Sequence, residues 1–429
     1  MVTTELKYGD THFHFEFDDN RFQILETGNT GVALTDLEIG AKLDRPIDSS
    51  KLEDLVEPGD RVLVVVPDAT REVACGQVVN VVVRRLIANG TAPSDINIIF
   101  ATGIHRSVTD EEKRSILTPF IAQRIKTLDH TPRDIANLVR LGETSSGIPI
   151  ELNRSLVEHG KVVLIGGIAF HYFAGFTGGR KLICPGLAST RTISATHKLA
   201  FDCDRRTRRD GVGIAVLESN AVHEAFVEVA SAIEHVFCIN TIVNDAGDLI
   251  DLFCGSLVDS HRLACESYAA RNSIEIDKRR EVVLASCGGL PYDINMIQAH
   301  KTLEAASHAC SDGGKLILLA QCVDGLGRAD FLKWFDAADS DQLAEKLCEN
   351  YQVNGQTAWN LLRIAEQFDV RVVTDLPVGG VEKMRMTHCR SLAEALDGID
   401  LVPGGFIMHS GARLRIRSAV GQEQRKTHP

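Results

Sequence analysis

The chain of 429 residues contains no apolar run near the roughly 18 residues that a helix needs to cross a bilayer. It also has no surplus of positive charge, because 46 Lys and Arg stand against 58 Asp and Glu, a formal net charge of −12. Binding to nucleic acid or to an anionic membrane relies on excess Lys and Arg, which displace counterions or meet acidic lipids. We therefore expect no nucleic-acid partner and no membrane partner.

Two further features are missing. The first residues contain neither the basic segment nor the apolar segment of a secretory signal. The eleven cysteines are scattered singly, without a Cys-x-x-Cys pair, which argues against cysteine-based zinc or iron–sulfur sites. Together these absences predict a cytoplasmic protein with reduced thiols, most of them small core residues.

What the sequence does contain is a series of short β-branched runs that alternate with helical segments. In the first half, strands are predicted at 61–66, 95–100 and 161–165, with a helix at 75–89. In the second half, strands are predicted at 281–286, 314–320 and 370–374, with a helix at 296–310. This alternation is typical of parallel sheets with crossover helices. An earlier strand is predicted at 12–17, with His12 and His14 on a solvated face.

A charged stretch at 269–280 separates the two series, and the length exceeds one ordinary core. We predict two α/β domains with mainly parallel sheets, one at 1–272 and one at 273–404, and we expect 405–429 to return to the first. Domain clefts often hold ligands, so we expect an interdomain active-site cleft. A mixed charge run at 202–210 predicts a solvated face.

Ligands of open α/β sheets bind beyond the carboxyl ends of the strands, and ionisable residues follow four of the predicted strands. They lie in the segments Asp68-Ala69-Thr70-Arg71, Gly103-Ile104-His105-Arg106, His171 to Lys181 with His197 beyond, and the 296–310 helix with Gln298 and Lys301. His105 and His171 are candidates for a general acid and base. Arg71, Gln298 and Lys301 are candidates for a carboxylate clamp, the last two at i and i+3 of one helix.

The segment 166–181 is rich in glycine, which lets a backbone approach a bulky ligand closely. Lys181 is able to bond covalently to a carbonyl-type group, and His197 is able to hold a metal ion. The segment lacks the Gly-Lys-Ser/Thr ending of a phosphate-binding loop. The glycines at 211 and 213 lack the third glycine of a dinucleotide fingerprint and follow no strand.

In their order and spacing, these motifs resemble the nickel-dependent lactate racemase family, whose members carry a nickel pincer nucleotide. The resemblance rests on Asp-x-Thr-Arg at 68–71, Gly-x-His-Arg at 103–106, the loop at 171–181 with His197, and Gln-x-x-Lys at 298–301. It covers nearly the whole chain. It implies an isomerase, a racemase or epimerase of small 2-hydroxy acids, which depends on cofactor-biosynthesis enzymes for its maturation.

The resemblance also implies a role for each candidate. Lys181 would carry the cofactor, Ni(II)-pyridinium-3,5-bisthiocarboxylic acid mononucleotide, through a covalent bond, and His197 would be the protein ligand of the nickel. The segment Asp68, Ala69, Thr70 and Arg71 would bind the nucleotide. His105 and His171 would exchange the hydroxyl proton while the C2 hydride moves reversibly to the cofactor. Arg71, Gln298 and Lys301 would bind the substrate carboxylate.

One position departs from the family pattern. Ile297 stands where the best-known lactate racemases have a tyrosine before the glutamine. Loss of the phenol leaves room in the pocket, so we expect a substrate other than lactate, with a larger or more polar substituent. Two alternatives stay open: a metal-dependent hydrolase or lyase that uses His105, His171 and His197 directly, and a non-catalytic protein that binds the cofactor.

Overall fold

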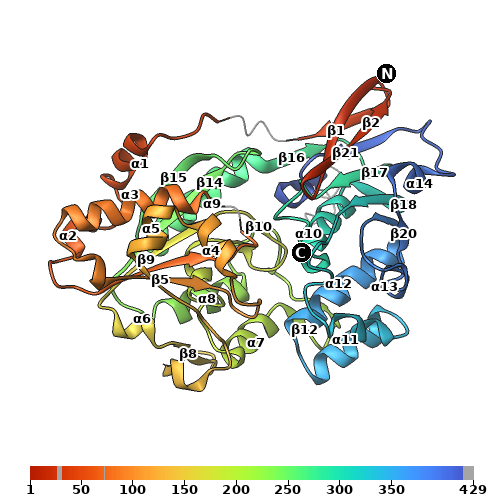
Figure 1. The fold of residues 1–429 in the computed structure, drawn as a ribbon. Coiled ribbons are helices and arrows are strands. Elements are labelled where there is room, and N and C mark those ends of the chain that lie inside the picture. Colours follow the sequence, from red (N-terminus) through yellow and green to blue (C-terminus); the bar gives the residue numbers. More distant parts are fainter. Residues whose placement is uncertain (27–30, 72, 419–429) are drawn as a thin grey trace, which may run out of the picture. The chain divides into compact units, whose positions relative to one another are not determined.

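The structure is a computed structural model that describes residues 1–26, 31–71 and 73–418. The chain forms two compact units. The N-terminal unit consists of Asn29–Ala200 and Arg209–Ala269, and the C-terminal unit consists of Met1–Gly28, Phe201–Arg208 and Ala270–Pro429. Each unit contains a predominantly parallel sheet with helices, so the protein is an α/β protein (Figure 1).

The main sheet of the N-terminal unit has, in the described residues, the strand order β15-β14-β9-β4-β5-β6. All pairs are parallel except β14 with β15. Its strands are β4 (Val62–Pro67), β5 (Ile96–Ala101), β6 (Lys126–Leu128), β9 (Lys161–Gly167), β14 (Val236–Val243) and β15 (Leu249–Gly255). Every residue of β4 is buried, as expected for a central parallel strand covered on both faces.

Within the described residues, this unit also contains helices and two small hairpins. The helices are α1 (Asp36–Leu43), α2 (Leu52–Leu55), α3 (Cys75–Ala88), α4 (Asp110–Ile116), α5 (Pro119–Arg124), α6 (Ser155–Glu158), α7 (Thr190–Lys198), α8 (Ala221–Ala230) and α9 (Asp259–Asn272), which runs across the unit boundary. The hairpins are β7 (Leu138–Glu143) with β8 (Pro149–Asn153), and β10 (Phe170–His171) with β11 (Gly175–Phe176). Helix α3 packs on β9 and α5, and its valines are buried against the sheet.

The main sheet of the C-terminal unit is parallel throughout and has the order β20-β19-β18-β17-β21-β3 within the described part of the chain. Its strands are β3 (Phe22–Leu25), β17 (Arg280–Ser286), β18 (Cys310–Leu319), β19 (Asp369–Val373), β20 (Thr387–Cys389) and β21 (Gly405–Met408). The helices are α10 (Met296–Ser307), α11 (Ser340–Glu349), α12 (Val353–Gln367), α13 (Val378–Lys383) and α14 (Leu392–Leu396). The predicted helix at 296–310 ends three residues early, because Cys310 already begins β18.

Three further strand pairs belong to the C-terminal unit. They are β1 (Val2–Tyr8) with β2 (Thr11–Phe17), β12 (Phe201–Asp202) with β13 (Thr207–Arg208), and β16 (Ser273–Ile276) with β22 (Arg415–Ser418). The strand predicted at 12–17 is confirmed as β2. Figure 1 shows the red β1–β2 hairpin, in which β1 contacts β17 and β18. One hairpin face joins the core of this unit through Leu6, Tyr8, Phe15 and Phe17.

This division differs from the expected one at both ends of the chain. The segment 405–429 was expected to return to the N-terminal domain, but β21 lies between β17 and β3 in the C-terminal sheet. The segment 1–28 also belongs to the C-terminal unit, for which β3 supplies an edge strand. An apolar run predicts a strand but not its sheet, because parallel partners are distant in sequence and meet only through tertiary packing.

The segment Phe201–Arg208 leaves the N-terminal unit and packs in the C-terminal one. Most of the charge run at 202–210 is exposed, as expected, but Arg208 is half-buried. Arg208 donates to the buried carboxylate of Glu304 at 2.8 Å and to Oδ1 of Asn360 at 3.2 Å. Burial alone raises the pKa of Glu304, but Arg208, with His308 and Asn360, lowers it to about 2. The pairing therefore fixes an ionised carboxylate inside the unit.

The expectation of reduced thiols is also wrong for one pair. Cys203 in this segment forms a disulfide with Cys348 of α11, with the two Cα atoms 5.6 Å apart. The other nine cysteines are free and buried, as expected for small core residues.

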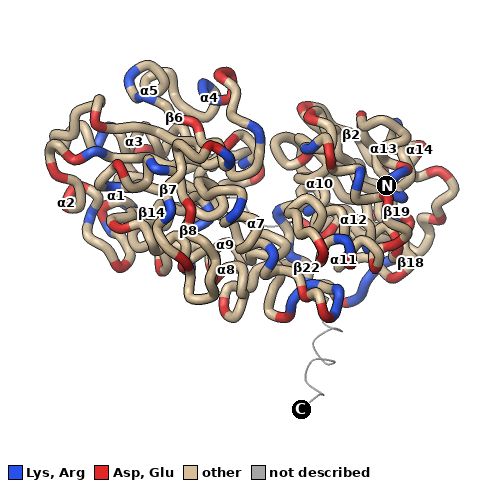
Figure 2. Tube along the Cα trace, turned by 90° about the horizontal axis from the view of Figure 1, so that it is seen from below, with Lys and Arg blue, Asp and Glu red and all other residues tan. Residues whose placement is uncertain are grey.

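Within the described residues, no helix combines the length and the apolar composition needed to cross a membrane. Figure 2 shows Lys and Arg interspersed with Asp and Glu along the trace of each unit.

Candidate active site

The carboxyl ends of β4 and β5 bring Asp68 and His105 together. The two strands pair in parallel up to Pro67 and Ala101, so the residues that follow them emerge at the same edge of the sheet. Oδ2 of Asp68 lies 2.7 Å from Nδ1 of His105, and Asp68 is only 6 % exposed. Burial alone raises the pKa of Asp68, but His105, Arg71 and Thr70 lower it to about 2. An ionised carboxylate only accepts, so Nδ1 of His105 donates to it, and neutral His105 carries its lone pair on Nε2.

The second oxygen of Asp68 is also engaged. Oδ1 accepts hydrogen bonds from the backbone N–H of Thr70 at 3.0 Å and from its hydroxyl at 2.6 Å. Ala69, Thr70 and Arg71 are half-buried in the same turn, and the N–H of Arg71 donates to the carbonyl of Asp68. The carboxylate of Asp68 therefore binds both the imidazole of His105 and its own turn. The pair of Asp68 and His105 joins residues 37 positions apart, and the sequence analysis did not predict it.

The chain after β9 brings His171, Lys181 and His197 around one aromatic ring. His171 lies in β10, Lys181 lies in the short 3₁₀ helix Gly179–Leu182, and His197 lies in α7. The ring of Phe173 lies 4.4 Å from that of His171 and 5.2 Å from that of His197, both edge to face. Nζ of Lys181 lies 5.8 Å from the same ring. The structure therefore brings together three of the side chains that the sequence analysis named as candidates.

His197 is held as a neutral imidazole. Its Nδ1 lies 2.8 Å from the carbonyl oxygen of Ile193, which it meets as a donor, so the lone pair is on Nε2. Burial, followed by the charge of Lys181, lowers the pKa of His197 to about 3. The aromatic ring of Phe226 packs 5.2 Å from the imidazole and 5.5 Å from Nζ of Lys181. A buried neutral imidazole with a fixed tautomer is suited to metal ligation.

Buried hydrogen bonds of Arg180 stabilise the loop that carries Lys181. Its side chain is 1 % exposed and donates to the carbonyl of Ala174 and to Nε2 of His261, each at 2.8 Å. Burial lowers the pKa of Arg180 to about 10, which leaves it charged at neutral pH. Sequence reasoning missed both Arg180 and His261, because their contact joins residues 81 positions apart and no local motif signals it.

The packing of this loop on its own unit requires its glycines. A Cβ at Gly175 would lie 2.2 Å from the carbonyl oxygen of Val216. At Gly178 it would lie 2.6 Å from Ile168, and at Gly179 it would lie 2.8 Å from His261. The φ angles of all three are positive, which disfavours any side chain. Close packing of the loop on its own unit therefore already requires glycine, whether or not a ligand approaches.

Gln298 and Lys301 lie on α10 of the C-terminal unit, whereas the residues above belong to the N-terminal unit. Asn295 caps the helix by accepting from the N–H of Gln298 at 3.0 Å. Nζ of Lys301 donates to Oε1 of Gln298 at 2.5 Å, so the two residues share a helix face, as their spacing predicts. Gln298 is 6 % exposed, and Ile297 packs against the main core of the unit.

The three histidines do not form a metal cluster by themselves. In the part of the chain that the structure describes, a group of three possible ligands with donor atoms within 4.8 Å is formed by Glu5, His12 and His14, and not by His105, His171 and His197. The hydrolase alternative, which needs those imidazoles to converge on one ion, therefore gains no support.

Comparison with known proteins defines the class. The N-terminal domain of lactate racemases matches residues 8–208, and the C-terminal domain of lactate racemases matches residues 276–404. Together with the α/β fold, these matches identify an isomerase, a racemase. The chain belongs to the lactate racemase family.

Two relatives are lactate racemases. That of Thermoanaerobacterium thermosaccharolyticum is 29% identical over 406 residues, which cover 92% of this chain and 94% of that protein. That of Lactiplantibacillus plantarum is 29% identical over 411 residues, with the same coverage of 92% and 94%.

Two solved structures share the fold. The lactate racemase apoprotein from T. thermosaccharolyticum superposes with a TM-score of 0.84 at 28% identity, covering 97% of this chain and 100% of that one. A protein from Thermotoga maritima has a TM-score of 0.70 at 19% identity, covering 92% of this chain and 100% of that one.

Proposed function

We propose that this racemase inverts the hydroxyl-bearing carbon of a 2-hydroxy acid with a nickel pincer nucleotide covalently attached at Lys181. The observation that carries the proposal is the convergence of His171, Lys181 and His197 on the ring of Phe173. The relatives are named lactate racemases. The nickel pincer nucleotide is the cofactor that the resemblance to this family implies.

The residues fit such a group. His197 offers Nε2 as a neutral donor for nickel, a metal that imidazole suits well. Lys181 is half-buried against two aromatic rings, on a loop held rigid by Arg180. A rigid attachment residue keeps a covalent group in one orientation. We assign nucleotide binding to the turn of Asp68, Ala69, Thr70 and Arg71, where the side chain of Asp68 contributes by shaping the turn.

When bound, the cofactor supplies a reversible acceptor for the hydride at C2 of the substrate. The chain supplies the proton chemistry. Asp68 holds His105 with Nδ1–H toward the carboxylate, so Nε2 takes the hydroxyl proton of one enantiomer, and His171 supplies the proton after inversion. Asp68 also stabilises the imidazolium that forms, as a buried carboxylate does in hydrolase triads. His171 is the second acid/base, because a racemase that accepts both enantiomers needs a proton acceptor for each.

Arg71, Gln298 and Lys301 are proposed to bind the substrate carboxylate, since a guanidinium and an ammonium both donate charge-assisted hydrogen bonds to it. The hydrogen bond from Lys301 to Gln298 sets the direction of the ammonium group. We propose a substrate other than lactate, because Ile297 replaces the phenol of a tyrosine with a smaller side chain that cannot hydrogen-bond. Maturation requires the enzymes that build the cofactor.

The test uses a C2-deuterated substrate and full-length protein made with and without the cofactor-building enzymes. We expect intact-mass measurement to show an adduct only in the first preparation, and only that preparation to be active. Deuterium at C2 should be largely retained on inversion, because a hydride held on the cofactor does not exchange with water. Rapid washout of deuterium into water would indicate proton abstraction from C2 and would contradict the proposal.

A further inference from the structure

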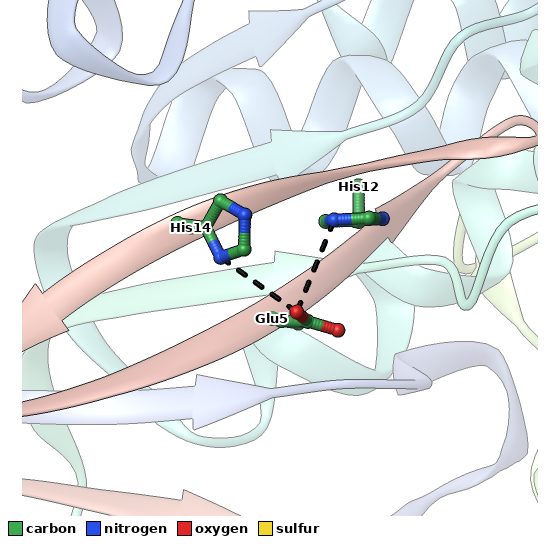
Figure 3. A group of neighbouring side chains, drawn as sticks. All are labelled: Glu5, His12 and His14. Atoms are coloured by element: carbon green, nitrogen blue, oxygen red, sulfur yellow. Dashed lines mark ion pairs between the residues drawn. The ribbon is translucent and has the colours of Figure 1, made fainter.

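The outer face of the β1–β2 hairpin carries three side chains of the kinds that bind transition metals. Glu5, His12 and His14 are all exposed, and their donor atoms lie within 4.8 Å of one another. Figure 3 shows the two imidazole rings and the carboxylate gathered above the paired strands. The sequence alone predicted a solvated face for the two histidines, and it gave no sign of Glu5 as a third member.

The strand pairing explains why the three residues meet. His12 and His14 are two residues apart on β2, so both point to the same face of the hairpin. Glu5 is the direct cross-strand partner of His14 in the antiparallel register. On the opposite face, Leu6 and Phe15 are buried in the core, which prevents a slip in register. The backbone under the cluster is therefore fixed before any ion binds.

The distances between the donor atoms are close to those found around a bound metal ion. Oε1 of Glu5 lies 3.8 Å from Nδ1 of His14 and 3.9 Å from Nε2 of His12. Bonds of about 2.0–2.2 Å to a tetrahedral ion place neighbouring donor atoms roughly 3.3 Å apart. Small rotations of exposed side chains close this gap without moving the strands.

We propose that Glu5, His12 and His14 form a surface site for one divalent transition-metal ion of the Ni²⁺ or Zn²⁺ type, completed by water. Two imidazoles and one carboxylate suit these ions, whereas Mg²⁺ and Ca²⁺ prefer oxygen ligands throughout. Lys7, the cross-strand partner of His12, weakens the attraction for a cation, while Glu16 on the same face strengthens it. The site shares no residue with the His197 and Lys181 cluster, so it stands independently of the proposed function.

Metal binding would tie the two strands of the hairpin together. An ion that binds only the paired strands stabilises the folded state by mass action. Because the other hairpin face belongs to the core of the C-terminal unit, this stabilisation should reach the unfolding of that unit.

The experiment is a calorimetric titration of untagged, full-length protein with Ni²⁺ alone. The comparison variants are the double variant His12→Gln and His14→Gln, the single variant Glu5→Gln, and His235→Gln as a control at another exposed histidine. We expect the double variant to bind one equivalent fewer than the wild type, and the control to bind the same number. In the Glu5 variant, the affinity at this site should fall by about tenfold or more, which requires only ~1.4 kcal/mol.

Two further measurements isolate the site. His197→Ala should keep the equivalent that the hairpin variant loses, and Ni²⁺ should raise the Tm of the wild type more than that of the double variant. Equal stoichiometry and affinity in the wild type and the double variant would overturn the proposal. Saturation of the same equivalent by Mg²⁺ at similar concentration would overturn it as well, because it would show a diffuse attraction for cations.

Discussion

The two units have similar sheets but use the polar residues at their strand ends differently. In the N-terminal unit, Asp68 at the end of β4 accepts from a titratable partner, His105 at the end of β5. In the C-terminal unit, Asp293 after β17 accepts from two backbone amides, of Gly9 at 2.7 Å and Gln321 at 3.2 Å. Tyr8 donates to Asp375 after β19 in the same region. At its strand ends, the N-terminal unit pairs a carboxylate with a histidine, whereas the C-terminal unit binds the loop that follows β1.

This contrast teaches how to interpret an ionisable residue at a strand end. A carboxylate whose partner is a histidine fixes the tautomer and the orientation of that imidazole. A carboxylate whose partners are backbone amides replaces lost hydration for those amides, and its contribution is to stability. Burial raises the pKa of Asp293 against the effect of its amide donors, whereas the pKa of Asp68 falls to about 2.

The largest effect is expected for Lys181→Ala. This variant should lose the covalent adduct and all measurable racemisation, because the attachment atom is gone. The free energy of unfolding should change little, since Lys181 is half-buried and contributes mainly ring contacts. Intact mass and racemisation are the measurements, and Lys198→Ala, an exposed lysine of α7, is the matched control. An adduct that persists in the Lys181 variant would place the attachment elsewhere.

Asp68→Asn is expected to come next. An amide removes the charge that holds Nδ1–H of His105, so kcat should fall by about 10²–10⁴-fold, the range for a lost acid/base function. The adduct at Lys181 should still form, which separates loss of proton transfer from loss of cofactor. Single-turnover rates and intact mass test this prediction. Unchanged kcat would show that His105 does not depend on its carboxylate partner.

Asp293→Ala should show the opposite pattern. Loss of the acceptor leaves the N–H groups of Gly9 and Gln321 without it, so the free energy of unfolding should fall by about 2–3 kcal/mol. The kcat of the folded enzyme with bound cofactor should stay within about twofold of the wild type, because the molecules that remain folded retain the proposed active site. Urea unfolding and kcat are measured on the same preparation. A large loss of kcat with a normal free energy of unfolding would show that Asp293 serves activity rather than stability, and would contradict the contrast with Asp68.

Acid should destabilise the two units over the same pH range. The folded pKa values of Asp68 and Glu304 are both lowered to about 2, so each contributes stability that is present above the ordinary carboxyl pKa. That stability is lost as the pH falls from about 4 to about 2, and amounts to roughly 2–3 kcal/mol per group. Unfolding of Glu304→Gln by urea should depend less on pH in this range. If the free energy of unfolding depended on pH equally in the wild type and in the Glu304→Gln variant, the contribution assigned to Glu304 would be wrong.

The smallest effect is expected for Ile297→Tyr. A tyrosine restores volume and a hydroxyl, so the ratio of kcat/KM for lactate to that for bulkier 2-hydroxy acids should rise by about tenfold, in line with the 1–3 kcal/mol typical of pocket changes. A panel of lactate, malate, phenyllactate and an aldonic acid measures the ratio. If lactate is already the best substrate of the wild type, the inference from Ile297 is wrong.

Local patterns in the sequence were sufficient for much of the fold. Strands β4, β5, β9, β17 and β19 lie within one or two residues of their predicted positions, because a mainly apolar, β-branched run bounded by turns is typical of a buried parallel strand. The i and i+3 spacing of Gln298 and Lys301 predicted their shared helix face, because residues three positions apart are neighbours on a helix surface. In each case the pattern depends on neighbours along the chain.

Only the tertiary structure decided which distant segments meet. Asp68 with His105, Arg180 with His261, and Arg208 with Glu304 are pairs whose members lie far apart in the sequence. The same holds for the Cys203–Cys348 disulfide and for the place of β21 and β3 in one sheet. The residues and their order set the available chemistry. The pKa values of Asp68 and His197 depend on burial in the folded chain, and the grouping of Glu5 with His12 and His14 depends on the register that arises when the strands pair.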